Sequence, residues 1–196
     1  MVVLAILGLG ITALLQTISW GITYARDTEN NIKAINIARE GIEAMSNIRD
    51  TNWLRFSSDK INCWKVKDYA AGCIGVPGFV WIISSGSYTT YPQSGVWYLS
   101  GGLSVPFTNW ATYKPIYSVG LDSNGFYTQT WIVNIWCSSS LQRDCRTIFT
   151  REISISIPAP WTQTGEISVA SIVRWQDERP HRVILEMSLT NWKSNF

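Results

Sequence analysis

The distribution of hydrophobic and charged residues divides the chain into three stretches. No charged side chain occurs from Met1 to Tyr24, and residues 2–15 are nearly all apolar. From residue 26 to residue 53 apolar residues recur every three or four positions among charged ones, which is typical of an amphipathic helix. Beyond Trp53 short apolar runs alternate with Gly, Ser and Pro. The pattern predicts a hydrophobic helix at 1–25, an amphipathic helix at 26–53 and a β-rich head at 54–196.

The uncharged first stretch is too apolar to have water as its solvent. At about 1.5 Å per residue it spans the roughly 30 Å hydrocarbon core of a bilayer. It ends in Trp20 and Tyr24, followed by Arg26, and these are residue types that usually lie at the membrane–water interface. We therefore expect one bilayer crossing, or a place among other helices. A removable secretory signal is the alternative, but a basic start and a clear cleavage site are not evident. A generic single-pass anchor is a second alternative.

The two helical stretches are predicted to form one rod. The apolar positions of the second stretch are expected to face the head, and they are Ile32, Ile35, Ala38, Ile42, Met45 and Ile48. No Pro occurs before Pro77, and no Gly/Ser linker separates the stretches. A continuous helix of about 50 residues, near 75 Å long, follows.

The remainder of the chain predicts an antiparallel sheet. Strands are expected at about 79–83, 96–99, 126–136, 146–157, 167–176 and 181–192. Asn124-Gly125 predicts a hairpin turn, and the segment from Asp177 to Pro180 predicts another. The fold class is therefore α+β, with the last four strands as a meander whose one face buries the amphipathic helix.

The four cysteines form two close pairs without C-x-x-C spacing. Of the three possible connectivities we predict the nearest-neighbour one, Cys63 with Cys73 and Cys137 with Cys145, because each pair lies beside a predicted turn. Each bridge would contribute about 2–3 kcal/mol and would imply an oxidising, extracytoplasmic location. Four buried free thiols in a cytosolic protein are the alternative.

Composition and motifs do not favour catalysis or nucleic-acid binding. The net charge is +2, and the 16 basic residues are scattered along the chain, so we predict no obligatory nucleic-acid partner. His181 is the single histidine and has no evident partner, which argues against a catalytic triad or a multi-histidine metal site. Asp122 to Gly125 resembles part of a calcium loop, but the distant Glu is missing and a hairpin explains the same residues. We predict no enzymatic site, no metal and no cofactor.

An uncharged aromatic segment lies between Asp68 and Lys114. Its rings could form a subunit interface or a stacking platform for sugars, or they could be buried in a loop-rich extension of the head itself. These three interpretations remain open for Tyr88, Tyr91, Trp97, Tyr98, Phe107, Trp110 and Tyr113.

Three segments of the first quarter carry a resemblance to a known family. They are the apolar block at residues 2–10, the sequence Ala-Arg-Glu-Gly-Ile-Glu-Ala at 38–44, and Asn-Ile-Arg-Asp-Thr-Asn-Trp at 47–53. Together they resemble type IV pilins and the pseudopilins of secretion systems, which implies a long helix laid on an antiparallel sheet. The family carries a Glu directly before the apolar block, where this chain has Met1. We expect that the leader and this Glu were lost from the start of the sequence; the alternative is a subunit that lacks the carboxylate.

The resemblance implies a structural subunit of a surface filament used in adhesion, motility or DNA uptake. Its expected partners are identical subunits, inner-membrane lipid before assembly, and the pilus assembly machinery. Gly8 and Gly10 would let the rod bend or pack closely. The filament-core contacts would come from Val2, Val3, Leu4, Ile6, Leu7, Leu9, Ile11, Leu14 and Leu15. The alternatives are a single-pass anchored glycan-binding module and a secretion-system pseudopilin.

Overall fold

A computed structural model describes most of the helix and the sheet. The described residues are 2–67, 69, 71–76, 83–103, 109–110, 116–121, 127–129, 146–157, 165–177 and 179–191. The cysteine pair Cys137 and Cys145 lies outside them, as do residues 79–82 of the strand predicted at 79–83.

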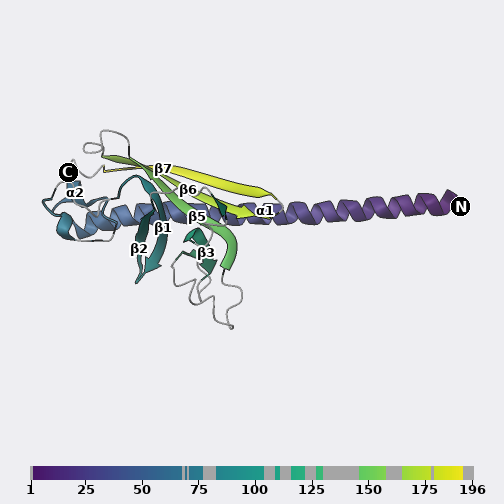
Figure 1. The fold of residues 1–196 in the computed structure, drawn as a ribbon, viewed down its shortest axis with the longest axis horizontal. Coiled ribbons are helices and arrows are strands. Elements are labelled where there is room, and N and C mark those ends of the chain that lie inside the picture. Colours follow the sequence, from purple (N-terminus) through teal and green to yellow (C-terminus); the bar gives the residue numbers. More distant parts are fainter. Residues whose placement is uncertain are drawn as a thin grey trace.

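Helix α1 (Val2–Arg55) is a single uninterrupted helix of 54 residues, which confirms the predicted rod. At about 1.5 Å per residue it is roughly 80 Å long. Figure 1 shows that its first half extends away from the sheet, so that the start of α1 lies at one end of the molecule and the head at the other. Within the described residues, no helix meets the combined length and apolarity needed to cross a membrane.

Three antiparallel strands form the largest part of the sheet. Strands β5 (Arg146–Ser156), β6 (Glu166–Gln176) and β7 (Pro180–Thr190) pair in sequence order, with Ile153 opposite Ser171 and Ser171 opposite Leu185. This meander and the turn before Pro180 were predicted. In that turn the Arg179 N–H donates to Asp177 Oδ1 at 3.2 Å, which holds the two long strands in register.

The other edge of β5 pairs with two hairpins placed end to end. Strand β1 (Gly86–Gln93) pairs with its later half, and strand β3 (Ser118–Leu121) pairs with its earlier half. β1 continues into β2 (Val96–Leu103), and β3 pairs with β4 (Tyr127–Thr128). The predicted Asn124-Gly125 turn lies outside the described residues. The prediction that the strand beginning near residue 126 neighbours β5 was wrong, because β3 lies between them.

The core lies between one face of the sheet and one face of α1. The buried helical residues recur every three or four positions and are Ala34, Ile37, Ala38, Gly41, Ala44, Met45, Ile48, Asn52 and Trp53. They pack against alternate residues of β6, which are Ile167, Val169, Ser171, Val173 and Trp175. The predicted stripe was wrong at Ile32 and Ile35, which are exposed, because the sheet contacts a face one residue further round the helix.

A compact unit caps the end of the head opposite the rod. It contains α2 (Lys60–Cys63) and the 3₁₀ turn η1 (Ala71–Cys73), and the predicted Cys63–Cys73 disulfide joins them with an S–S distance of 2.07 Å. Asn52 of α1 holds this unit in place, since its Nδ2 donates to the carbonyls of Trp64 and Val66 at 3.1 and 2.7 Å.

Candidate assembly surface

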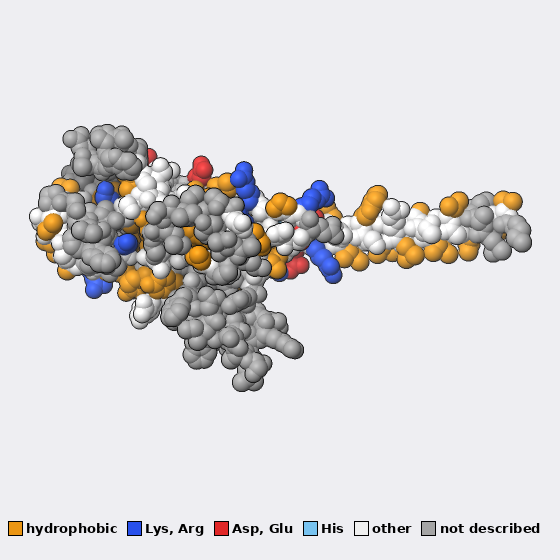
Figure 2. All heavy atoms as spheres, in the orientation of Figure 1, with side chains coloured by type: hydrophobic (Ala, Val, Ile, Leu, Met, Phe, Trp, Pro, Cys, Tyr) orange, Lys and Arg blue, Asp and Glu red, His pale blue; other side chains and the backbone are white. Residues whose placement is uncertain are grey.

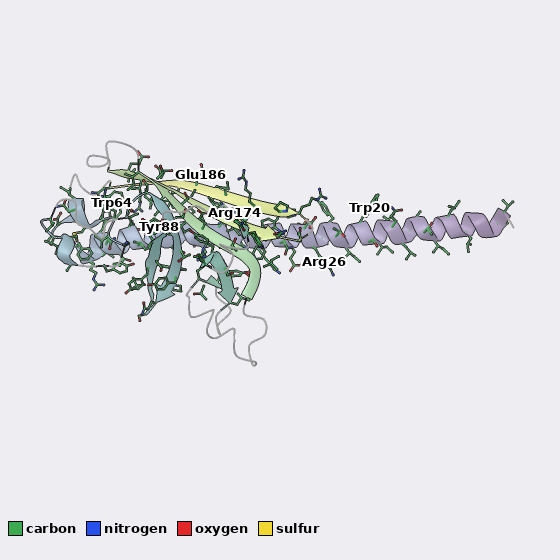
Figure 3. All side chains as sticks on the ribbon, in the orientation of Figure 1. Trp20, Arg26, Trp64, Tyr88, Arg174 and Glu186 are labelled. Atoms are coloured by element: carbon green, nitrogen blue, oxygen red, sulfur yellow. A yellow bond between two sulfur atoms is a disulfide. The ribbon has the colours of Figure 1, made fainter. Side chains whose placement is uncertain are left out.

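The free half of α1, residues 2–25, exposes its apolar side chains on every side, and we use the name rod for this half alone. Every described side chain from Val2 to Arg26 is exposed, and the large apolar ones among them are between 50% and 76% exposed. Figure 2 shows these hydrophobic side chains along the rod, and Figure 3 shows Trp20 projecting from it with no strand nearby. Of the predicted core residues, Val2, Val3, Leu7, Leu9, Ile11, Leu14 and Leu15 are exposed in this way, and the side chains of Leu4 and Ile6 are outside those described.

Several polar side chains of the rod are already paired within the helix. The hydroxyls of Thr12, Thr17 and Thr23 donate to the carbonyls of Leu9, Ala13 and Ser19, at 2.9, 2.9 and 3.1 Å. A hydroxyl that is satisfied in this way costs little when the helix leaves water. These threonines therefore do not prevent the rod from packing in an apolar environment, which the sequence alone did not show.

The glycines of the rod leave its flank open. A Cβ added at Gly8, Gly10 or Gly21 would meet no atom within 4 Å. These positions therefore have no packing role inside a single chain, unlike Gly41 described below. They leave room for a neighbouring helix to approach the backbone closely.

Charged residues begin where the rod meets the head. Figure 2 shows basic and acidic side chains gathered at this junction. Among them Lys33 Nζ lies 2.5 Å from Glu29 Oε1, one turn away along the helix. The hydrogen bond between them lowers the pKa of Glu29 and raises the pKa of Lys33. We call this junction, residues 26–33, the collar: it is a solvated segment between the apolar rod and the packed head.

Beyond the collar, a glycine allows α1 to approach the sheet closely. A Cβ at Gly41 would lie 2.5 Å from Ser171 Oγ, 2.8 Å from Ile153 Cδ1 and 3.1 Å from Arg151 Cδ. Glycine is needed here for space rather than for backbone freedom. The close approach brings the helix backbone within hydrogen-bonding distance of a charged residue on β5.

That residue is Arg151, a fully buried cation at the centre of the helix–sheet interface. Its Nη1 donates to Glu40 Oε1 at 2.9 Å and to the Ile37 carbonyl at 3.2 Å, and its Nε donates to Gln129 Oε1 at 2.9 Å. Burial lowers the pKa of Arg151, and the Glu40 carboxylate opposes that shift. Because α1, β5 and the residue after β4 all contribute, the network fixes the helix on the sheet.

Gln129 links this network to the strands. Its Nε2 donates to the carbonyls of Tyr117 and Arg151, at 3.0 and 2.5 Å. A second buried charge, Glu152, lies on the opposite face of β5, where it accepts from Ser87 Oγ and from Arg174 Nη1 at 2.6 Å each. These polar pairs join residues far apart in the sequence, so no local sequence motif predicts them.

The described aromatic residues of the segment divide between the core and a separate group of tyrosines. Tyr88 is 1% exposed and belongs to the core, so it cannot contact a sugar or a neighbouring subunit, and Trp97 packs against the same core. Tyr91 and Tyr98 stack with ring centroids 5.7 Å apart. Tyr69, which was not predicted, meets Tyr98 edge to face. Trp110 is half-buried, and Phe107 and Tyr113 lie outside the described residues.

The described residues contain no cluster of three or more His, Cys, Asp or Glu side chains that could hold a metal ion. His181 stacks on Trp175 with ring centroids 5.0 Å apart, and its Nε2 lies 3.1 Å from Asp177 Oδ1. The Arg179 N–H is the main cause of the lowered pKa of Asp177. This group lies where β6 ends and β7 begins, at the turn between the two strands.

No family model, no curated protein and no solved structure matches this chain significantly. The fold itself defines an α+β protein in which one long helix packs on an open antiparallel sheet.

Proposed function

We propose that this protein is a structural subunit of a type IV pilus-like surface filament and that it polymerises through the free half of α1. The single observation that supports this most is the rod itself, which carries exposed aliphatic side chains around its whole circumference. Monomeric soluble proteins rarely expose apolar surface on this scale. A rod of this kind requires a neighbour.

We propose that the rod of each subunit packs against the rods of identical subunits. Burying even ~1,000 Å² of apolar surface at about 25 cal/mol per Å² gives tens of kcal/mol relative to water. The paired threonine hydroxyls of the rod add little desolvation cost to that transfer. Before assembly the same surface is proposed to contact inner-membrane lipid, so that assembly exchanges one apolar environment for another.

The shape of the molecule favours an open polymer over a closed dimer. The rod and the head lie at opposite ends of the long axis (Figure 1), so rods can bundle only if the heads lie beside or outside them. Contacts between different surfaces of successive copies generate a helical filament when the rotation does not close into a ring. The rod would form the centre of such a filament and the sheet its outer layer.

Electron microscopy of sheared surface material, with peptide sequencing of the fibres, tests this proposal. Cells that express the wild-type chain should yield thin fibres containing it. The variant Leu14→Glu should yield none, because a charge in an apolar helix bundle is very costly. Ile184→Glu is the matched control, since Ile184 is an exposed aliphatic residue on the head, and it should assemble normally.

Fibres formed by Leu14→Glu at wild-type abundance would exclude the rod as the polymerising element. Detergent-soluble monomers from the wild type, with no fibre containing the chain, would exclude polymerisation as its role. Equal thermal unfolding of the two purified variants in detergent would show that the head is folded in both.

A further inference from the structure

The cap at the far end of the head exposes aliphatic side chains that the filament core does not use. Leu54 is 79% exposed, Ile61 65%, Val76 47% and Ile74 46%. All four belong to the last turn of α1 or to the segment that contains α2 and η1. Exposed aliphatic residues occur singly on most proteins, but here four occur in one short unit.

The cap is rigid enough to present these side chains together. The Cys63–Cys73 disulfide joins α2 to η1, and Gly75 N–H donates to Asp59 Oδ2 at 2.6 Å. Ile74 and Val76 flank Gly75, and Ile61 follows Asp59 by two residues. The unit is in turn held to α1 by Asn52. The exposed aliphatic residues therefore belong to one braced unit, with Leu54 on the last turn of α1 and the other three next to the disulfide-linked elements.

The charge of the cap is positive. Arg55, Lys60, Lys65 and Lys67 fall within this segment. Asp59 is the acidic residue described there, and its carboxylate is occupied by Gly75 N–H and by Asn62; Asp68 lies outside the described residues. Figure 2 shows basic and hydrophobic side chains at this end of the molecule, opposite the tip of the rod.

We propose that the cap docks on an anionic lipid bilayer surface. Aliphatic side chains enter the headgroup region while basic side chains around them meet the lipid phosphates, which is the combination that peripheral membrane binding requires. A second copy's rod suits the cap less well, because residues 1–24 carry no charge and offer no anionic group to a basic surface. The cap faces away from the rod, so a subunit whose rod is already occupied can still make this contact.

Vesicle tethering by the full chain tests the proposal. The chain is reconstituted through its rod into phosphatidylcholine vesicles, and flotation checks its incorporation. Labelled second vesicles are then added, made either of phosphatidylcholine alone or of equal parts phosphatidylcholine and phosphatidylglycerol. Tethering of the anionic vesicles alone, weakened by added salt, is expected. A chain that does not incorporate is floated directly with the two vesicle types, and the same preference is expected.

Two pairs of substitutions locate the contact. Leu54→Ser with Ile61→Ser removes aliphatic contacts, and Arg55→Gln with Lys60→Gln removes charge; the charge pair should weaken binding by on the order of twentyfold, about fivefold for each basic side chain. Ile184→Ser with Arg182→Gln, at exposed positions of β7, is the matched control and should tether like the wild type. Thermal unfolding of each variant shows whether the head remains folded.

Equal binding of neutral and anionic vesicles, or wild-type tethering by both cap variants, would overturn the proposal. Loss of tethering with the control pair would do the same, because the contact would then lie on β7. The outcome is separate from that for polymerisation: fibres without tethering leave the filament proposal standing, and tethering without fibres leaves the cap proposal standing.

Discussion

The two halves of α1 have the same backbone conformation in opposite surroundings. Residues 2–25 contact no other element and expose apolar side chains on all sides, whereas residues 34–55 bury one face on the sheet. An isolated helix with Gly8, Gly10 and Gly21 would be marginal in water, because each glycine costs about 1 kcal/mol relative to alanine. The docked half supplies the helical nucleus from which the free half continues. Packing in one half thus supports the conformation of the other.

The comparison also shows two uses of small and polar residues in one helix. Gly41 lies against Ser171 and Ile153, whereas the glycines of the rod have nothing near them. Glu40 pairs with a buried arginine, whereas the rod's threonines pair with their own helix. Contacts with the head of the same chain fix the position of the docked half, whereas the free half remains available to contact another molecule.

The largest effect is expected from removing the buried cation. Arg151→Met should lower the free energy of unfolding of the head by about 3 kcal/mol, because it leaves Gln129 and the Ile37 carbonyl without their donor. Urea unfolding measures this loss. Amide hydrogen exchange should rise in residues 34–55 and stay unchanged in residues 2–25.

Arg151→Lys is the informative control for that experiment. It keeps the charge beside Glu40 but lacks the planar fork that reaches four partners, so its loss should be smaller and still measurable. Unchanged stability of Arg151→Met would mean that the network contributes no net stabilisation.

A smaller effect is expected where the helix approaches the sheet. Gly41→Ala should destabilise the head by about 1–3 kcal/mol, because its Cβ would overlap Ser171 Oγ and Ile153 Cδ1. Gly21→Ala should instead stabilise the rod helix by up to about 1 kcal/mol, since nothing lies near that position. Thermal unfolding and helical circular dichroism measure the two changes.

Adding Ser171→Ala to Gly41→Ala should restore part of the loss, because it removes the closest clashing atom. Within the part of the chain that the structure describes, the Ser171 hydroxyl has no hydrogen-bond partner, so Ser171→Ala alone should cost little. A double variant no more stable than Gly41→Ala would show that Ser171 is not the source of the clash.

The smallest effect is expected at the cap and depends on pH. Burial raises the pKa of Asp59, but hydrogen bonds from Asn62 and from the Gly75 N–H outweigh it and lower the pKa below 3.8. Its stabilisation is therefore present above pH 3.8 and is lost as the pH falls through the lower, folded-state value. Asp59→Asn should cost about 1 kcal/mol at neutral pH, because the neutral amide has one acceptor oxygen where the carboxylate uses both to accept from Asn62 and Gly75.

The difference between Asp59→Asn and the wild type should vanish in acid, where the wild-type carboxyl is protonated. Unfolding midpoints measured across the acidic range check this. A difference that persists unchanged in strong acid would assign the effect to the shape of the side chain rather than to its charge.

The sequence predicted the helix, the β5–β6–β7 meander and the Cys63–Cys73 bridge because each has a local signal. The helix has periodicity without breakers, and the long strands alternate apolar and polar residues. The bridge joins cysteines ten positions apart beside a turn. Strand β1 was missed because its buried positions include Ser87, Thr89 and Thr90, so it does not read as an apolar run.

The parts of the site that were missed depend on contacts between distant residues. Arg151 reaches Glu40 across 111 positions and Gln129 across 22, and no spacing rule connects them. The error of one helical position at Ile32 and Ile35 has a similar cause. Both faces of α1 are apolar near residue 35, so the sequence could not decide which one the sheet covers and which one continues the exposed surface of the rod.

The unbroken helix has a consequence for the geometry of any assembly. Because no loop separates the rod from the head, the orientation of the head about the helix axis depends on the number of helical residues in the segment 26–33. Inserting one residue there would turn the head by about 100° and shift it by about 1.5 Å, whereas inserting seven would return it to within about 20° of its original orientation. In the proposed filament, the number of residues in the collar would therefore determine which side of the sheet faces a neighbouring rod.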